Sequence, residues 1–182
     1  TNFTKITTNL NFEGNIDFGT KNICKIKRNG DLLGRIYLKM KFPSISESDI
    51  DTTDDKTNLY IRWSESPGYS IIENISIKIG GQEIDKQDGI YMQIWSDITD
   101  DQEVKLCLLG NKTYMIQPLK NQPSTTVYAP LKFWFCESFS QHLPLISLQY
   151  HEIEIEVELK NFHSMYQILR KTGTKTYDYT NY

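Results

Sequence analysis

Apolar and polar residues alternate along two segments of the chain, residues 131–136 and 152–159. Side chains of a β-strand point to opposite faces in turn, so each segment is predicted to form a strand with one buried face. Phe133 and Ile155 are predicted to lie on the buried faces, whereas Lys132 is expected to be exposed. The chain between the two segments is too short for a crossover helix, which favours antiparallel structure within an all-β domain.

Alternation also predicts extended elements earlier in the chain. Residues 23–27 and 35–42 are predicted strands. The Asn29-Gly30 pair between them is typical of a tight hairpin turn, because both residues tolerate positive φ. One more extended segment is predicted over residues 8–18.

The middle of the chain combines a strand pattern with a helix pattern. Over residues 69–86 the apolar positions follow strand spacing, and Gly80-Gly81 inside this region suggests a bulge, a tight turn or a close backbone approach. Residues 88–99 have apolar side chains at helical spacing, which predicts a short amphipathic helix. The apolar positions of that helix are Tyr91, Ile94, Trp95 and Ile98.

Composition places the chain among single-domain globular proteins. Its 182 residues suffice for one domain with a sizeable core, and 38% of them are hydrophobic. A formal net charge of −3 gives no electrostatic reason to expect direct contact with nucleic acid. No run of about 20 apolar residues occurs, so no transmembrane segment is predicted. The wide spacing of Cys24, Cys107 and Cys136 favours reduced, packed thiols over disulfides or a zinc site, and suggests folding in the cytosol.

Several groups of side chains resemble functional sites but lack the spacing that such sites need. Asp49, Asp51, Asp54 and Asp55 offer oxygens for calcium, yet their loop lacks the glycine and terminal glutamate of a calcium-binding motif. A solvated acidic loop is the better interpretation. The sequence has neither a serine nucleophile elbow nor a phosphate-binding glycine motif. The histidines are scattered and form no cupin-type metal pair; they are His142, His151 and His163.

Two further patterns have both a functional and a structural interpretation. The glutamates of residues 152–159 could provide paired carboxylates for glycoside cleavage, but four acids on one strand face are more typical of a solvated or interface-facing surface. Trp63, Trp95 and Trp134 could stack on sugar rings, although large β domains commonly bury such residues. No catalytic, cofactor-binding or metal-binding residue is therefore assigned, and no enzyme is predicted. The glutamates are Glu152, Glu154, Glu156 and Glu158.

Three ordered blocks resemble the major capsid proteins of large nucleocytoplasmic DNA viruses. Phe18-Gly19, followed by IKRNGDL at 26–32, is similar to the opening block of that family. IGGQEIDK at 79–86, with Trp95 in the helix after it, resembles a second block. PLKFWF at 130–135 and LPLISLQYHE at 143–152 together resemble a third and longest block.

The resemblance implies a structural protein of the virion. The family folds as two consecutive eight-stranded jelly rolls, and three chains form a pseudo-hexagonal capsomer that tiles an icosahedral shell around an internal membrane. Residues 1–182 are expected to form one jelly-roll domain, as a partial chain without the last strand of that roll and without the second roll. The expected partners are two more copies in a homotrimer formed through the jelly-roll flanks and loops, neighbouring capsomers and minor capsid proteins. Assembly is expected in the host cytoplasm.

Two other interpretations stay open. The chain could be a minor capsid, penton or spike protein built on one jelly roll, which the full open reading frame would decide. It could also be a glycan-binding β-sandwich, which would bind sugars as a monomer.

Under the capsid interpretation, a missing last strand predicts an unfilled slot beside the first strand of the sheet. The isolated chain is then expected to aggregate or to be partly molten, because unpaired buried backbone groups are costly.

Overall fold

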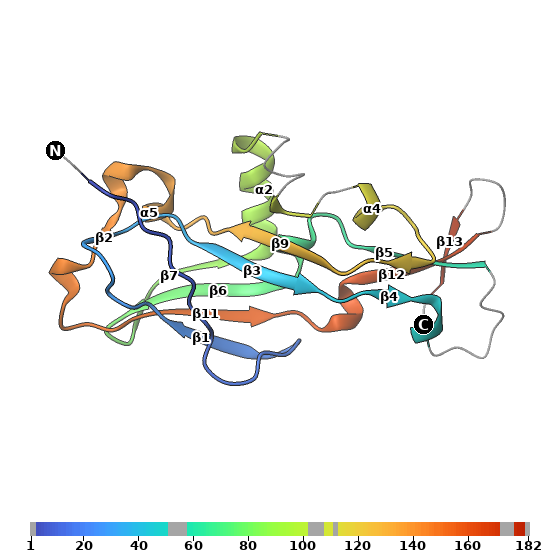
Figure 1. Ribbon diagram of the computed structural model, residues 1–182, viewed down its shortest axis with the longest axis horizontal. Coiled ribbons are helices and arrows are strands. Elements are labelled where there is room, and N and C mark those ends of the chain that lie inside the picture. The colour runs from blue at the N-terminus through green and yellow to red at the C-terminus, as the bar shows by residue number, and fades with distance from the viewer. Residues whose placement is uncertain (1–2, 51–57, 102–107, 111–112, 172–176, 181–182) are drawn as a thin grey trace.

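A four-stranded antiparallel sheet forms one layer of the computed structural model (Figure 1). Its strands lie in the order β1-β11-β6-β7. Inward positions of the sheet carry the buried side chains of Ile75, Ile77, Ile153, Ile155 and Val157. The strands span Lys21–Lys25 (β1), Ile153–Leu159 (β11), Ile72–Ile79 (β6) and Gln82–Asp88 (β7). The structure describes residues 3–50, 58–101, 108–110, 113–171 and 177–180.

A two-stranded layer packs against the inner face of this sheet. It pairs β3 (Tyr37–Phe42) with β9 (Thr125–Pro130) in antiparallel register. Leu38 and Phe42 of β3 are buried in the core that both layers share, whereas Lys39 is exposed on the outer side. The core therefore lies between two sheet layers, which is the arrangement of a β-sandwich.

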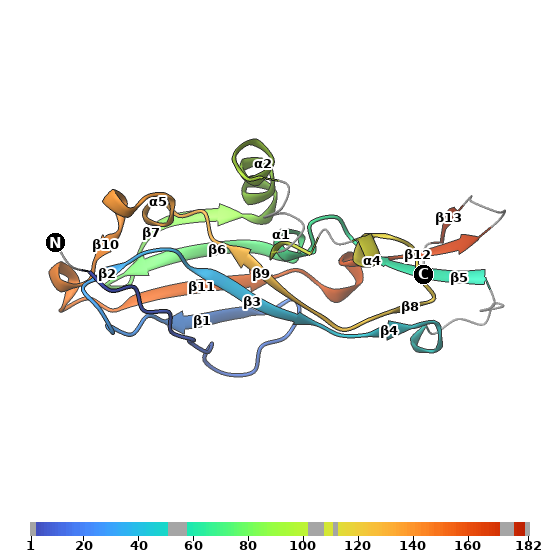
Figure 2. The same ribbon diagram turned by 45° about the horizontal axis from the view of Figure 1, so that its top comes forward.

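Smaller sheets extend the elongated molecule at both ends (Figures 1 and 2). One end carries the three-stranded sheet β13-β12-β5 and the pair β4-β8, and the other end carries the pair β2-β10. These strands span Leu32–Leu33 (β2), Ile45–Ser46 (β4), Leu59–Trp63 (β5), Asn121–Gln122 (β8), Leu143–Pro144 (β10), Tyr166–Lys171 (β12) and Tyr177–Thr180 (β13).

Among the described helices, α2 (Gly89–Thr99) is the longest. It begins after Asp88, whose carboxylate caps the helix by accepting a hydrogen bond from the backbone N–H of Tyr91. The helix projects beyond the sheets (Figure 2). The shorter helices and 3₁₀ turns are α1 (Pro67–Ser70), α4 (Thr113–Ile116), α5 (Trp134–Glu137), η1 (Glu47–Asp49), η3 (Phe139–Gln141), η4 (Ile146–Leu148) and η5 (Phe162–Ser164).

The alternating patterns predicted several elements correctly. Strands β3 and β11 lie in predicted segments, and Phe133 and Ile155 are buried as expected. Most of the region 69–86 forms the β6–β7 hairpin, with Gly80-Gly81 as a tight turn in which the two φ angles are 60° and 81°. The helix predicted over 88–99 is α2. The all-β antiparallel architecture with one short helix near residues 88–99 is thus confirmed, while the count of eight strands stays a prediction.

The strand predicted over 131–136 is wrong. Strand β9 ends at Pro130, and the following chain leaves the sheet and forms α5 instead of continuing as a strand over 131–136. Phe133 is nevertheless buried, as predicted. An alternating pattern indicates which side chains face the core, but it does not determine whether the backbone forms the hydrogen bonds of a sheet. The segment 8–18 contributes a single isolated bridge, between Glu13 and Ile23. Conversely, β5 and β12 lie where no strand was predicted.

The hairpin predicted at Asn29-Gly30 is also wrong, since neither residue has positive φ. The next strand, β2, pairs with β10 and not with β1. Arg28 accounts for the difference, because its guanidinium donates hydrogen bonds to the backbone carbonyls of Leu148, Gln149 and His151. These bonds tie the segment to a part of the chain about 120 residues later, so distant contacts override the local turn preference.

The four-stranded sheet has no gap between β1 and β6, because β11 occupies that position. It pairs with β1 from Lys21 opposite Glu158 to Lys25 opposite Glu154, and with β6 along its other edge. In the facing layer β3 pairs with β9 alone among the described strands, so the unfilled slot expected beside the first strand stays a prediction. That the chain is partial, without the family's last strand and second roll, stays a prediction.

Candidate interaction surfaces

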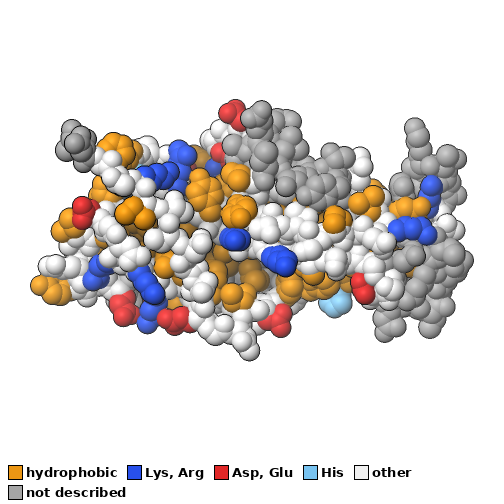
Figure 3. All heavy atoms as spheres, in the orientation of Figure 1, with side chains coloured by type: hydrophobic (Ala, Val, Ile, Leu, Met, Phe, Trp, Pro, Cys, Tyr) orange, Lys and Arg blue, Asp and Glu red, His pale blue; other side chains and the backbone are white. Residues whose placement is uncertain are grey.

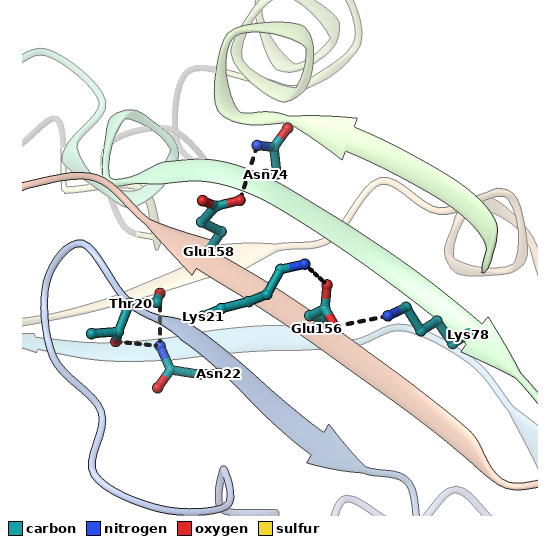
Figure 4. Close-up of polar contacts among 7 residues, drawn as sticks. All are labelled: Thr20, Lys21, Asn22, Asn74, Lys78, Glu156 and Glu158. Carbon is teal, nitrogen blue, oxygen red and sulfur yellow. Dashed lines mark hydrogen bonds and ion pairs between the residues drawn. The ribbon is translucent and has the colours of Figure 1, made fainter. Parts of the chain in front are cut away.

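The outward face of the four-stranded sheet carries the glutamate ladder of β11. Glu156 lies between two lysines of the neighbouring strands, with Lys21 Nζ 2.5 Å from Oε1 and Lys78 Nζ 2.8 Å from Oε2 (Figure 4). The hydrogen bonds from Lys21 and Lys78 hold the pKa of the Glu156 carboxyl below its usual range. Although it faces outward, Glu156 is buried by these neighbours. It therefore acts as the centre of an ion-pair network across three strands.

The other glutamates of the ladder also have partners on adjacent strands. Glu158 accepts a hydrogen bond from the side-chain amide of Asn74, at 3.3 Å. Lys25 Nζ lies 3.5 Å from a carboxylate oxygen of Glu152 and 3.8 Å from one of Glu154. Lysines and amides thus compensate the negative charge, so the ladder is a charge-balanced sheet surface, with no geometry that singles out two carboxylates for glycoside cleavage.

The histidines lie in three separate places. The His142 ring packs against Gly34, the His151 ring lies beside Gly80 in the β6–β7 turn, and His163 Nδ1 is 3.4 Å from the hydroxyl of Tyr166. Among the residues that the structure describes, no three His, Cys, Asp or Glu side chains gather in a way that could hold a metal ion.

Only part of the acidic loop can be described. Asp49 accepts hydrogen bonds from the backbone N–H and the hydroxyl of Ser46, both at 2.8 Å, and so caps the turn η1. The other candidate calcium ligands, Asp51, Asp54 and Asp55, lie outside the described residues.

Two of the three cysteines are buried free thiols, Cys24 and Cys136. Burial raises the pKa of both, to about 11 for Cys136, which keeps the thiols protonated and unreactive near neutral pH. This confirms the prediction of packed thiols for these two residues. Cys107 lies outside the described residues.

The three tryptophans occupy two different environments. Trp63 is buried in the core, against Phe42 and Phe162. Trp95 of α2 and Trp134 of α5 are partly exposed and line one shallow groove of about 770 Å³. Tyr91 stacks beside Trp95 in the same groove, with 6.2 Å between the ring centroids. The structure thus brings together two aromatic residues that the sequence placed far apart.

Lys132, which was predicted to be exposed, lies at the edge of this groove as half of an ion pair. Its Nζ is 2.8 Å from both carboxylate oxygens of Asp100, the residue directly after α2. The Lys132 side chain is only 11% exposed. The prediction failed because Asp100 comes from an irregular region whose position was not readable from the sequence.

The apolar stripe of α2 faces outward. The helix packs on the body through Gly89, Met92 and Ser96, whereas the apolar positions that its spacing revealed remain accessible. Amphipathicity showed that the helix has an apolar face, but it did not show that this face points away from the core. The exposed side chains are Ile90, Tyr91, Ile94, Trp95 and Ile98.

Residues 1–181 match a protein-family model described as the major capsid protein N-terminus. The chain belongs to the major capsid protein family. It is 33% identical to the major capsid protein of Phaeocystis pouchetii virus, across 98% of this chain and 39% of that protein. It is 32% identical to the major capsid protein of Chrysochromulina ericina virus, across 88% of this chain and 35% of that protein. The chain therefore spans less than half the length of the relatives that it matches.

Solved structures share the fold of this major capsid protein chain. VP54 of PBCV-1, fitted into a reconstruction of the virophage Sputnik, gives a TM-score of 0.64 at 19% identity, over 92% of this chain and 42% of VP54. The Faustovirus major capsid protein gives a TM-score of 0.61 at 12% identity, over 95% of this chain and 48% of that protein. The jelly-roll prediction is thereby confirmed. No helix within the described residues is long and apolar enough to cross a membrane.

Proposed function

We propose that this chain is the first jelly roll of a structural protein that builds the icosahedral capsid of a large DNA virus. The observation that carries the proposal is the match of residues 1–181 to the family's N-terminal model, together with relatives that are named major capsid proteins. The chain spans about two fifths of such a relative. That share leaves room in the whole protein for a second roll of similar size.

The proposed building unit is a homotrimer that forms through the flanks and loops of the jelly roll. A sandwich whose core is enclosed by its own strands gives a rigid block, and its connecting segments supply the contact surfaces. Neighbouring capsomers and minor capsid proteins would be the remaining partners. The protein would reside in the capsid of the virion after assembly in the host cytoplasm.

Contacts with nucleic acid have no part in this proposal. The net charge of −3 and the compensated lysines of the four-stranded sheet offer no extended basic surface for a phosphate backbone on that face. Protein–protein contacts would therefore hold the shell together, and the burial of Cys24 and Cys136 as free thiols supports assembly without disulfides at these two residues.

The oligomeric state of the full-length protein tests the proposal. Sedimentation velocity in reducing buffer with a metal chelator should give trimers, because neither disulfides nor metal ions are proposed to hold the subunits. Monomers under these conditions, with trimers only in oxidising or metal-containing buffer, would contradict it. Binding of glycans by a stable monomer would favour a glycan-binding sandwich instead.

A further inference from the structure

Asn29-Gly30 is the only Asn-Gly pair in the sequence, and it does not form the hairpin turn that it predicts. Both residues are exposed and lie in the segment that joins β1 to β2. In Figure 3 the end of the molecule that carries β2 and β10 shows basic, acidic and hydrophobic side chains at its surface. The pair is therefore open to water.

The backbone at Gly30 is unhindered. A Cβ atom placed there would have no neighbouring group within 4 Å. Among the described residues, no acceptor takes a hydrogen bond from the Gly30 N–H. Glycine also lacks the Cβ that would crowd its own nitrogen, and asparagine is one of the thermally labile side chains. Asn29 thus places a labile amide directly before an accessible backbone nitrogen.

We propose that Asn29 is a site of spontaneous deamidation. The Gly30 nitrogen gives up its proton to solvent and attacks Cγ of Asn29, so that an N–Cγ bond forms. The Cγ–Nδ2 bond breaks, and Nδ2 leaves as ammonia. Water then opens the cyclic imide at either carbonyl and leaves aspartate or isoaspartate at this position. One water is consumed and one ammonia is released, and the proposed capsid function is not involved.

The modification would act on the tie that Arg28 makes to a distant part of the chain. The Arg28 guanidinium donates a hydrogen bond to the carbonyl of Leu148, 120 residues later, at 2.7 Å. On the other side of Asn29, the carbonyl of Asp31 accepts a hydrogen bond from the N–H of Leu145, at 2.8 Å. Isoaspartate adds a carbon to the backbone between these two anchors. We expect this added length to loosen the contact between the two segments.

Asp88-Gly89, the only Asp-Gly pair in the sequence, is the matching pair in a constrained setting. Aspartate before glycine can form the same imide by loss of water. The Asp88 carboxylate, however, accepts a hydrogen bond from the N–H of Tyr91 at 2.7 Å. The backbone at Gly89 is also packed against the carbonyl oxygens of Tyr69 and Ile72. Of the two pairs, only Asn29-Gly30 is therefore expected to accumulate isoaspartate.

Ageing of the full-length protein at raised temperature, followed by peptide mass spectrometry, tests the site. The peptide with Asn29 should gain the mass difference between an amide and an acid, faster at pH 9 than at pH 7, because the attacking nitrogen must lose a proton. Gly30→Ala should slow this conversion by about tenfold, since its Cβ hinders the attack. Exposed Asn15, which precedes the bulky Ile16, is the internal control. Labelling by an isoaspartyl methyltransferase should mark position 29 and not Asp88.

Hydrogen exchange measures the structural consequence. Ion-exchange chromatography separates the deamidated protein by its additional negative charge, and its Leu145 amide should exchange about tenfold faster than in fresh protein. Asn29→Gln, which keeps an amide but lengthens the side chain, should show neither the conversion nor the faster exchange after the same ageing.

Each result bears on one part of the proposal. Conversion of Asn29 no faster than that of Asn15, or equal conversion in Gly30→Ala, would overturn the deamidation site. Conversion that leaves exchange at Leu145 unchanged would overturn the predicted loosening of the Arg28 tie. The oligomeric state of fresh protein tests the capsid function separately, so failure of one proposal is distinguishable from failure of the other.

Discussion

Gly89 begins α2 at a point where the backbone of the body leaves no room for a side chain. A Cβ atom there would collide with the carbonyl oxygens of Tyr69 and Ile72. Gly89→Ala must therefore shift either the helix or the main chain below it, with an expected loss of about 1–3 kcal/mol in unfolding free energy. Urea unfolding measures the loss. Gly30→Ala is the control, since open space surrounds Gly30 and its φ is not positive, and it should stay within about 0.5 kcal/mol.

Phe133 and Lys132 are adjacent residues that stabilise the fold in different ways. Phe133 is fully buried, so Phe133→Ala should cost about 3–5 kcal/mol through lost contacts and a cavity. Lys132→Ala should cost about 1–3 kcal/mol, because Asp100 would lose its hydrogen-bonded partner in a mostly buried site. Urea unfolding of the two variants and of the wild type measures both losses in unfolding free energy. A Lys132→Ala variant as stable as wild type would show that the ion pair contributes nothing.

At the scale of secondary-structure elements, Glu156 links β11 to both neighbouring strands and should make stability pH-dependent. Its pKa in the folded protein is lowered from 4.5 by Lys21 and Lys78, so the stabilisation is complete above pH 4.5 and is lost as the pH falls through the folded-state value. Glu156→Gln should cost about 1–2 kcal/mol at pH 7, since Glu156 is buried while Lys21 stays largely exposed. The difference from wild type should shrink as the pH falls below 4.5.

Unfolding free energies measured from pH 3 to pH 7 test this dependence. Glu154→Gln is the matched control on the same strand face, where the nearest lysine lies 3.8 Å away and is well exposed. The control should lose much less stability at pH 7. A stability difference for Glu156→Gln that stays constant across the whole range would contradict the assigned origin of the pKa shift.

Local sequence patterns predicted those elements whose structure depends on local interactions. The Gly80-Gly81 turn, the helical spacing of α2 and the alternation of β11 all follow from backbone conformation or side-chain facing. The Asn29-Gly30 hairpin failed because Arg28 binds carbonyls far along the chain. The strand expected over 131–136 failed because a buried alternating pattern also fits a segment that ends in a helical turn, α5.

At the scale of the whole molecule, the candidate interaction surfaces were only partly readable from the sequence. The apolar positions of α2 and the glutamates of β11 were recognised, but their surroundings depend on tertiary structure. Lys21 and Lys78 reach Glu156 only because β11 lies between β1 and β6. Likewise, Trp134 and Trp95 line one groove only because the fold brings α5 and α2 to its two sides. Such contacts between distant segments have no signature in a single sequence.

The place of β11 in the strand order gives the last prediction, which concerns folding of the whole chain. A chain truncated after Glu152 would lack β11, leaving facing edges of β1 and β6 unpaired and removing Ile155 and its buried neighbours from the core. Exposed strand edges promote aggregation, so this truncation should be insoluble or partly molten. Truncation after Lys171 removes β13, which pairs with β12 alone among the described strands, and it should keep a cooperative transition.

Urea unfolding followed by tryptophan fluorescence and by circular dichroism distinguishes these outcomes. For residues 1–182 and for residues 1–171 the two probes should give coincident single transitions, because the buried Trp63 reports on the same core that the strands enclose. Residues 1–152 should give no cooperative transition. If residues 1–152 also unfold cooperatively as a soluble monomer, the sheet can close without β11, and the central position of that strand does not control the stability of the fold.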